Sequence, residues 1–234
     1  MKITVGCPIK DRYWILPTWF QYVEESADIA NVDVNYLFVV SKNDIRTLEI
    51  LESKDNVKLI YTEEPDETYR RAWNQTRYEE MALLRNKLLR EVRKIKPFYF
   101  LSLDSDILIH PQAIKNMFDA FEIYPDAWAV GSKCFLSTTT KVHPNMGNWS
   151  DHKFNRYYRA DSESLLEVDI LMAIKMMSPK AYNIDYQSHI NGEDLGWSKS
   201  VKIAGGQMFW DGQVTSKHVM TRKMFDVVDK RVGY

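Results

Sequence analysis

Two carboxylates end an apolar, aromatic-rich stretch of the sequence. Residues 98–111 read FYFLSLDSDILIHP, in which aromatic and aliphatic side chains give way to Asp104, Ser105 and Asp106. Two acids one residue apart can share a divalent cation, or one can bind it while the other contacts a sugar hydroxyl. Mg²⁺ and Mn²⁺ prefer oxygen ligands, and Mg²⁺ sites commonly combine one or two carboxylates with substrate phosphates. The same pair could also simply end a strand and keep a turn solvated.

Three further polar groups could act together with this pair. They are Arg85 and Asn86 just upstream, Glu193 and Asp194 in NGEDLGWS, and His218 near the end of the chain. Each group also has an ordinary structural explanation. An RN pair can lie on an exposed helix, acids are favoured in the first turn of a helix, and a lone histidine is often an ordinary side chain.

Strand-like and helix-like segments alternate through the first half of the chain. Strands are predicted at residues 2–9, 32–40, 56–61, 97–103 and 127–133. Helices are predicted at residues 14–27, 44–53, 77–95 and 111–121. This alternation predicts an α/β fold, with a mostly parallel sheet and helices on both faces. Because ligands collect at the carboxyl ends of such strands, Asp104 and Asp106 lie where a substrate would bind.

The second half of the chain is less regular. Residues 137–167 contain few apolar pairs and predict a long excursion or lid, followed by a buried strand at 168–177. A short helix is predicted within 192–206, and two short strands at 207–212 and 214–220. Without an internal repeat, a single domain with a C-terminal elaboration is the simplest account.

Composition excludes several classes of protein. The chain has 234 residues, 45% of them apolar, which is enough to fold without covalent staples. Two cysteines without a CxxC pair argue against a disulfide framework or a structural zinc site. No segment approaches the length of a signal peptide core or a membrane span, so we expect a soluble, cytoplasmic protein. A net charge of −1 argues against a nucleic-acid partner.

Taken in order, the motifs are an RN pair, a DxD, an ED pair and a late histidine. This order resembles the nucleotide-sugar glycosyltransferases of the GT-A fold, particularly family 2 and its relatives. In that family an ARN-like stretch precedes the DxD strand; here it reads Leu84-Arg85-Asn86. The opening VGCPIKDR is similar to the family's PxxNR-type motif, with Asp11 where Asn is common. The resemblance covers most of the chain.

The resemblance implies a GT-A fold and a metal-dependent hexosyltransferase-type activity. A sugar would move from a nucleotide-diphosphate donor, such as a UDP- or GDP-sugar, to an acceptor hydroxyl, with Mn²⁺ or Mg²⁺ as cofactor. Asp106 would ligate the cation, Asp104 would contact it through water or bind the ribose, and His218 would complete the metal site. Asp194 would deprotonate the acceptor in an inverting reaction, and Glu193 would bind acceptor hydroxyls.

The resemblance also divides the chain into a nucleotide-sugar-binding half, residues 1–133, and an acceptor-binding half, residues 134–234, with residues 137–167 as its lid. The residues that would bind the nucleotide sugar are Pro8, Asp11, Arg12, Asp44, Arg85, Asn86 and Ser105. Asn86 would also fix its helix against the DxD strand. Trp197 and Trp149 are the candidates for stacking on an acceptor sugar.

Three alternatives remain open at this point. Related GT-A families include retaining enzymes with a similar DSD strand. A sugar-phosphate nucleotidyltransferase shares the parallel sheet and the acidic metal site, but it normally begins with a Gly-rich loop, and VGCPIKDRYW has one Gly. A sugar-binding module of the same fold could have lost the chemistry.

Overall fold

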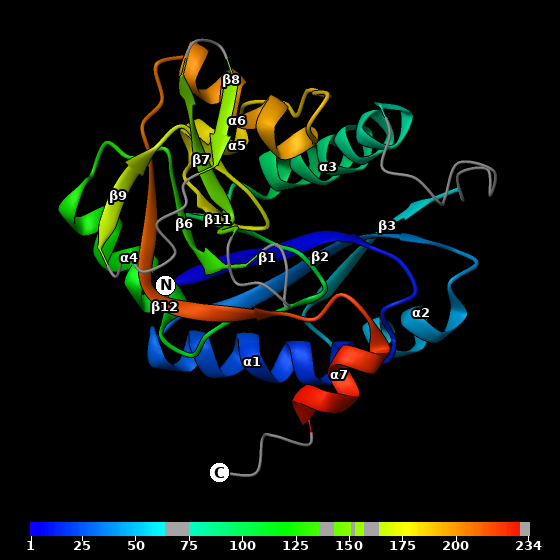
Figure 1. Ribbon diagram of the computed structural model, residues 1–234. Coiled ribbons are helices and arrows are strands. Elements are labelled where there is room, and N and C mark those ends of the chain that lie inside the picture. Colours follow the sequence, from blue (N-terminus) through cyan, green and yellow to red (C-terminus); the bar gives the residue numbers. More distant parts are fainter. Residues whose placement is uncertain (64–74, 136–142, 151–152, 157–163, 230–234) are drawn as a thin grey trace.

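A mixed sheet forms the centre of the protein. The computed structural model describes residues 1–63, 75–135, 143–150, 153–156 and 164–229 (Figure 1). The main sheet has nine strands in the order β3-β2-β1-β4-β11-β6-β12-β5, with β9 paired to β12 outside this path. Strands β10, β7 and β8 form a second, three-stranded sheet.

The first half of the chain follows the predicted alternation. Its elements are β1 (Lys2–Ile9), α1 (Leu16–Ile29), β2 (Asp33–Ser41), α2 (Ile45–Glu52), β3 (Val57–Thr62), α3 (Gln75–Ile95) and β4 (Phe100–Leu103). Strand β1 pairs in parallel with β2 and β4, and β2 pairs in parallel with β3. The α/β class with a mostly parallel sheet is therefore confirmed.

The second half returns into the same sheet. Its elements are β5 (Ile107–Leu108), α4 (Ala113–Ile123), β6 (Ala129–Cys134), β11 (Ile174–Met177), α5 (Pro179–Tyr182), α6 (Glu193–Ile203), β12 (Met208–His218) and α7 (Arg222–Asp229). Strand β11 runs antiparallel between β4 and β6. Strand β12 is parallel to β6, shifts register between Asp211 and Thr215, and then pairs antiparallel with β5. The two short strands predicted at 207–212 and 214–220 are thus one bulged strand.

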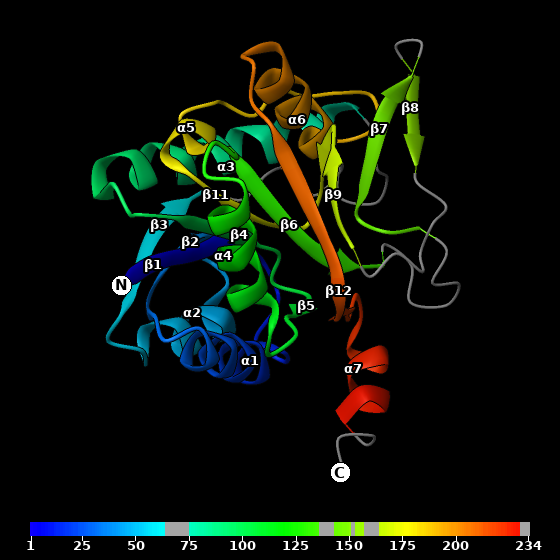
Figure 2. The same cartoon turned by 90° about the vertical axis from the view of Figure 1, so that its left-hand side faces the viewer.

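The predicted long excursion at 137–167 is partly regular structure. It contains β7 (Met146–Ser150), β8 (Lys153–Arg156) and the start of β9 (Leu165–Val168), and β10 (Ile170–Leu171) follows. The prediction of a single strand at 168–177 is also wrong, because these residues belong to three separate strands, β9, β10 and β11. Residues 137–142, 151–152 and 157–163 of the predicted lid lie outside the described residues. Figure 2 shows β7 and β8 to one side of the main sheet.

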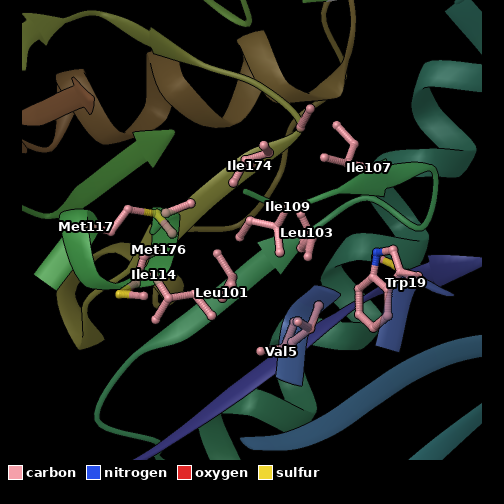
Figure 3. Packing of buried hydrophobic residues seen from close by; sticks show 14 of the residues in the cluster. Val5, Trp19, Leu101, Leu103, Ile107, Ile109, Ile114, Met117, Ile174 and Met176 are labelled. Atoms are coloured by element: carbon pink, nitrogen blue, oxygen red, sulfur yellow. The ribbon is translucent and has the colours of Figure 1, made fainter. Parts of the chain in front are cut away.

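Each face of the sheet has its own hydrophobic core. Helices α1 and α4 pack on one face. There Ile114 and Met117 lie beside Leu101 and Met176, and the same cluster extends to Trp19 (Figure 3). Helices α3, α5 and α6 pack on the other face, and their core includes the buried side chains Leu88, Val92, Tyr182, Trp197 and Val201. Because helices cover both faces, the ends of the strands are the parts of the sheet that a substrate can reach. Within the described residues, no helix combines the length and the apolar character needed to cross a membrane.

Candidate active site

The acidic pair lies in a tight turn at the carboxyl end of β4. The backbone N–H of Ile107 donates to the carbonyl of Asp104 at 3.1 Å and closes the turn. The N–H of Asp104 donates to the carbonyl of Ala173 at 3.1 Å, and the indole of Trp19 donates to the Asp104 carbonyl at 3.2 Å. These bonds fix the turn to Ala173, the residue before β11, and to α1. Ser105, between the two acids, is buried.

Strand pairing brings His218 to Asp106. His218 is the last residue of β12 and pairs with Ile107 of β5, while the N–H of Val219 donates to the Asp106 carbonyl at 2.7 Å. The His218 Nε2 lies 3.6 Å from Asp106 Oδ1, and its Nδ1 lies 3.1 Å from the carbonyl oxygen of Phe135. Burial alone would lower the pKa of His218, but the Asp106 carboxylate outweighs it and raises that pKa.

Arg12 holds the other oxygen of Asp106. Its Nη2 donates to Asp106 Oδ2 at 2.8 Å, although the two residues are 94 positions apart in the sequence. Burial would raise the pKa of Asp106, but the contacts with His218 and Arg12 lower it. Asp106 is therefore an ionised carboxylate with a basic group on each oxygen.

Arg85 joins the RN, DxD and ED motifs. This side chain of α3 is buried, and it donates to Asp104 Oδ1 at 2.9 Å and to Glu193 Oε1 at 3.0 Å. Its Nε also lies 3.9 Å from Asp194 Oδ1. Burial raises the pKa of both Asp104 and Glu193, although Arg85 opposes the shift. The three motifs thus meet around one guanidinium.

Asp194 is held by two residues at the start of β11. Its Oδ1 accepts a hydrogen bond from Lys175 Nζ at 2.6 Å, and its Oδ2 accepts one from the N–H of Ala173 at 3.2 Å. Burial would raise the pKa of Asp194, but Lys175 and Arg85 outweigh it and lower that pKa. Asp194 is buried in the first turn of α6, whose N-cap residue Gly192 has φ of 120°.

A second turn follows β1, next to the site. The N–H of Asp11 donates to Asp44 Oδ2 at 2.7 Å, and the N–H of Arg12 donates to Thr47 Oγ1 at 3.3 Å. Asp11 has φ of 53°, and Asp44 is buried at the N-cap of α2. Pro8 lies inside β1, paired with Val39 of β2. The opening motif and Asp44 therefore form one substructure, which Arg12 links to Asp106.

Structural comparison identifies the fold of the chain. No protein-family model and no curated protein matches the chain. CMP:2-keto-3-deoxy-manno-octonic acid synthetase complexed with CTP gives a TM-score of 0.56 at 13% identity, over 99% of this chain and 98% of that chain. TarS 1–349 from S. aureus gives 0.56 at 10% identity, over 97% of this chain and 63% of that chain. The chain has a GT-A-like fold.

A third solved structure has the same GT-A-like fold. It is 4-diphosphocytidyl-2C-methyl-D-erythritol synthase from Anaerococcus prevotii, with a TM-score of 0.54 at 11% identity, over 100% of this chain and 96% of that chain. Identities this low relate the proteins by fold. A hollow of about 590 Å³, lined by residues that include Arg93, Phe98 and Pro179, contains no member of the acidic cluster.

Two predicted site residues have other surroundings than expected. The Asn86 side chain donates to the Tyr186 carbonyl at 2.9 Å and accepts from the Tyr186 N–H at 2.7 Å. It therefore fastens α3 to the segment before α6 and not to the DxD strand. Trp197 is fully buried and stacks on Tyr186 with ring centroids 5.8 Å apart, so its prediction as a sugar-stacking side chain is wrong. Trp197 follows Asp194 by three residues, but on α6 that position faces the core.

The remaining candidate, Trp149, lies in β7. Its half-buried ring meets that of His189 edge-on, with centroids 5.5 Å apart. Sequence reasoning missed Lys175 entirely. The signal that could have found it is a single lysine inside the apolar run VDILMAIKMM, where a buried charge needs a partner.

Proposed function

We propose that this protein is a metal-dependent glycosyltransferase, which moves a sugar from a nucleotide-diphosphate donor to an acceptor hydroxyl with inversion. The observation that carries the proposal is the pairing of Asp106 with His218, beside Asp104, at the carboxyl end of β4. In open sheets of this kind substrates bind at that end.

The Asp106–His218 pair suits a divalent cation. If the His218 Nδ1–H donates to the Phe135 carbonyl, the neutral Nε2 directs a lone pair toward a carboxylate oxygen 3.6 Å away. Two acceptors so placed are stable only with a proton or a cation beside them. Metal-binding histidines are commonly oriented in this way by a carbonyl on the other nitrogen.

The donor's phosphates would have to complete the metal site. Among the described residues, no group of three or more His, Cys, Asp or Glu side chains is arranged to hold a metal ion. Arg85 binds Asp104, and Arg12 binds Oδ2 of Asp106. The atoms that would bind the cation directly are therefore Asp106 Oδ1 and His218 Nε2, which lie 3.6 Å apart. Such a site matches Mg²⁺ or Mn²⁺, which are often held by one or two protein ligands together with phosphate oxygens. A bound cation of this kind would neutralise the charge of the diphosphate leaving group.

On the donor side, the turn after β1 would hold the nucleoside of a UDP- or GDP-sugar. Asp11, Arg12 and Asp44 line this turn, and Ser105 lies between the two acids. Arg12 is placed to exchange its contact with Asp106 for one with a phosphate when the cation binds. Guanidinium groups suit phosphate oxygens because their donors form a planar fork.

On the acceptor side, Asp194 would act as general base and Glu193 would bind acceptor hydroxyls. The lowered pKa of Asp194 keeps it ionised at neutral pH, so it can accept a proton. A positioned base contributes roughly 10²–10⁴-fold to such a step. Trp149 remains the proposed contact for an acceptor sugar.

A nucleotidyltransferase is the main competing proposal, since the fold is shared with the synthetase that binds CTP. Such enzymes cradle a triphosphate with a Gly-rich loop. Here residues 10–15 contain no glycine, and Gly6 lies inside β1, where an added Cβ would fall 1.9 Å from the Leu37 carbonyl oxygen. Gly6 therefore serves strand packing, which favours glycosyl transfer.

Metal-dependent donor binding tests the proposal. UDP-, GDP- and CMP-sugars are added with Mn²⁺ or with EDTA, and the shift in melting temperature is measured, because a ligand of the folded state raises its stability. We expect a shift with one donor class that requires Mn²⁺ and is lost in Asp106→Ala. Asp119→Ala, which removes an exposed carboxylate paired with Lys115, is the matched control and should retain it.

The products distinguish the reactions when a nucleoside triphosphate is also supplied in a parallel sample. Release of free sugar and a nucleoside diphosphate, without acceptor, supports glycosyl transfer. Release of pyrophosphate from a nucleoside triphosphate would instead establish the nucleotidyltransferase. Equal donor affinity with Mn²⁺ and with EDTA would contradict the metal site.

A further inference from the structure

Lys175 is a fully buried lysine in the middle of the sheet. It lies in β11, a strand whose four residues are all buried, and its side chain has 0% exposure. Lysine is among the residues least often buried unless it is paired. The partner is Asp194, whose Oδ1 lies 2.6 Å from the Lys175 Nζ.

Two aromatic rings fix the path of this side chain. The Lys175 Nζ lies 5.5 Å from the ring centroid of Tyr186 and 5.3 Å from that of Trp197. Cations within about 6 Å of an aromatic face are attracted by its quadrupole, and more strongly so away from water. Asn86 in turn binds the backbone of Tyr186 through both atoms of its amide. Lys175 therefore has little freedom to leave Asp194.

The same turn that presents Lys175 also binds the second oxygen of Asp194. The N–H of Ala173 donates to Oδ2 at 3.2 Å, and Ala173 has φ of 61°, in the left-handed region that non-glycine residues seldom adopt. Uncommon backbone conformations of this kind occur where surrounding structure requires them. Both carboxylate oxygens are thus held by residues two apart at the opening of β11, and the carboxylate cannot rotate.

Lys175 also sets the charge balance around Asp194. The charged groups that face Asp194 are Lys175 from β11, Arg85 from α3, Glu193 from α6 itself, and Asp104 from the turn after β4. Arg85 contacts all three carboxylates. Without Lys175, one guanidinium would face two buried acids, Glu193 and Asp194, and the half-buried Asp104.

We propose that Lys175 is a positioning residue, which holds the Asp194 carboxylate in the one orientation from which it accepts the proton of the acceptor hydroxyl. This inference rests on the proposed function. The pair makes Asp194 a weaker base, but an ionised and preoriented one. Orientation is the larger effect, since a displacement of about 1 Å in a reacting group can cost roughly 10²-fold in rate.

Lys175→Met tests this role, because methionine fills most of the same volume without the charge. We expect kcat for sugar transfer to fall by roughly 10²-fold, with the Kd of the donor unchanged. The acid limb of the pH–rate profile should move to higher pH, because the pKa of Asp194 is no longer lowered by Lys175. A structural ion pair alone would reduce stability and leave the acid limb in place.

Lys133→Met is the matched control. Lys133 is also a largely buried lysine, on the adjacent strand β6, whereas the side chains that chiefly lower the pKa of Asp194 are Lys175 and Arg85. This variant should keep the wild-type acid limb. A Lys175→Met enzyme with wild-type kcat, or with an unmoved acid limb, would overturn the inference.

A second measurement needs neither activity nor a stable variant. Carbon NMR of labelled aspartate in the wild-type protein gives the pKa of Asp194 directly, and the inference requires it to lie below the ordinary value of 3.8. A value at or above 3.8 overturns the inference. If the wild-type protein transfers no sugar, the proposed function fails, while this titration still decides whether Lys175 holds Asp194 as an ionised, fixed carboxylate.

Discussion

At the scale of single residues, a substitution of Asp194 tests the proposed chemistry most directly. Asp194→Asn keeps the shape of the side chain but cannot take a proton. We expect turnover to fall by roughly 10²–10⁴-fold, with donor binding retained. Turnover and the anomeric configuration of the product, followed by NMR, check this. A product that retains the donor's configuration, or an active variant, would remove Asp194 from the role of base.

The same substitution has a cost in stability that the sequence did not indicate. It leaves the buried ammonium of Lys175 beside a neutral amide, and breaking a buried ion pair on one side typically costs about 3–5 kcal/mol. Turnover should therefore be measured at a temperature where circular dichroism shows the variant to be folded.

His218 gives a prediction that depends on pH. Its pKa is raised in the folded protein above the ordinary 6.5, because Asp106 outweighs the effect of burial. A raised pKa stabilises the fold fully below pH 6.5, and that contribution is lost as the pH rises through the folded-state value. In metal-free protein, proton NMR should show His218 titrating above 6.5, and Asp106→Asn should lower its pKa.

His110 serves as the internal control for that titration. Burial lowers its pKa, and it contacts neither Asp106 nor His218. Its titration should be the same in the wild-type protein and in Asp106→Asn. A His218 pKa at or below 6.5 in the wild-type protein would contradict the contact with Asp106.

The meeting of the DxD, the ED pair and His218 could be expected from the sequence, because each lies near the end of a predicted element. The RN pair lies in the middle of its predicted helix, and only the family resemblance placed it at the same site. The role of Lys175 could not be expected, because its apolar neighbours indicate that it is buried but do not show that its partner is Asp194, 19 residues away. Trp197 was misassigned because spacing from Asp194 does not tell which side of α6 faces the core. The local sequence pattern thus indicates where polar residues gather, while contacts between distant segments determine what each residue does.

At the scale of elements, the position of α6 depends on one glycine. A Cβ on Gly196 would fall 1.8 Å from the backbone carbonyl oxygen of Gln187, so α6 lies closer to that segment than any other residue would allow. In an exposed helix, Gly→Ala stabilises by up to about 1 kcal/mol. Here the sign should reverse, and we expect Gly196→Ala to destabilise the protein by about 1–3 kcal/mol in urea unfolding.

Gly196→Ala should also impair the site, because Glu193 and Asp194 begin the same helix. Lys199→Ala, an exposed position on α6, is the control and should change stability by less than about 0.5 kcal/mol. Unchanged stability in Gly196→Ala would mean that α6 can move away from Gln187 freely.

Helices and strands of the first half could be predicted closely, because the apolar period changes clearly between them. The strand β7 could not, because polar contacts with a distant segment hold it in place. The N–H of Trp149 donates to Asp169, and the N–H of Asp169 donates to the Asn148 side chain, at 3.0 and 2.8 Å. A polar stretch whose partner lies some 20 residues on resembles a loop when it is examined alone.

At the scale of the whole molecule, the two halves of the chain share one sheet. Strand β11, from the second half, lies between β4 and β6 of the first. A fragment of residues 1–133 therefore lacks the strand that joins β4 to β6, and we expect no cooperative unfolding transition in urea. A fragment of residues 1–220 keeps every strand of the sheet and should retain one. A cooperative transition in the shorter fragment would show that the first half folds alone.

The late arrival of β11 has a consequence for synthesis in the cell. When β6 leaves the ribosome, β1 is already available to pair with β4 on one side, but the strand that covers its other edge, residues 174–177, is not yet made. At about 5–20 residues per second, that wait is on the order of seconds. An open, apolar strand edge can pair with another chain. The nascent protein should therefore depend on chaperones during this interval, and slower translation between β6 and β11 should lower its yield of folded product.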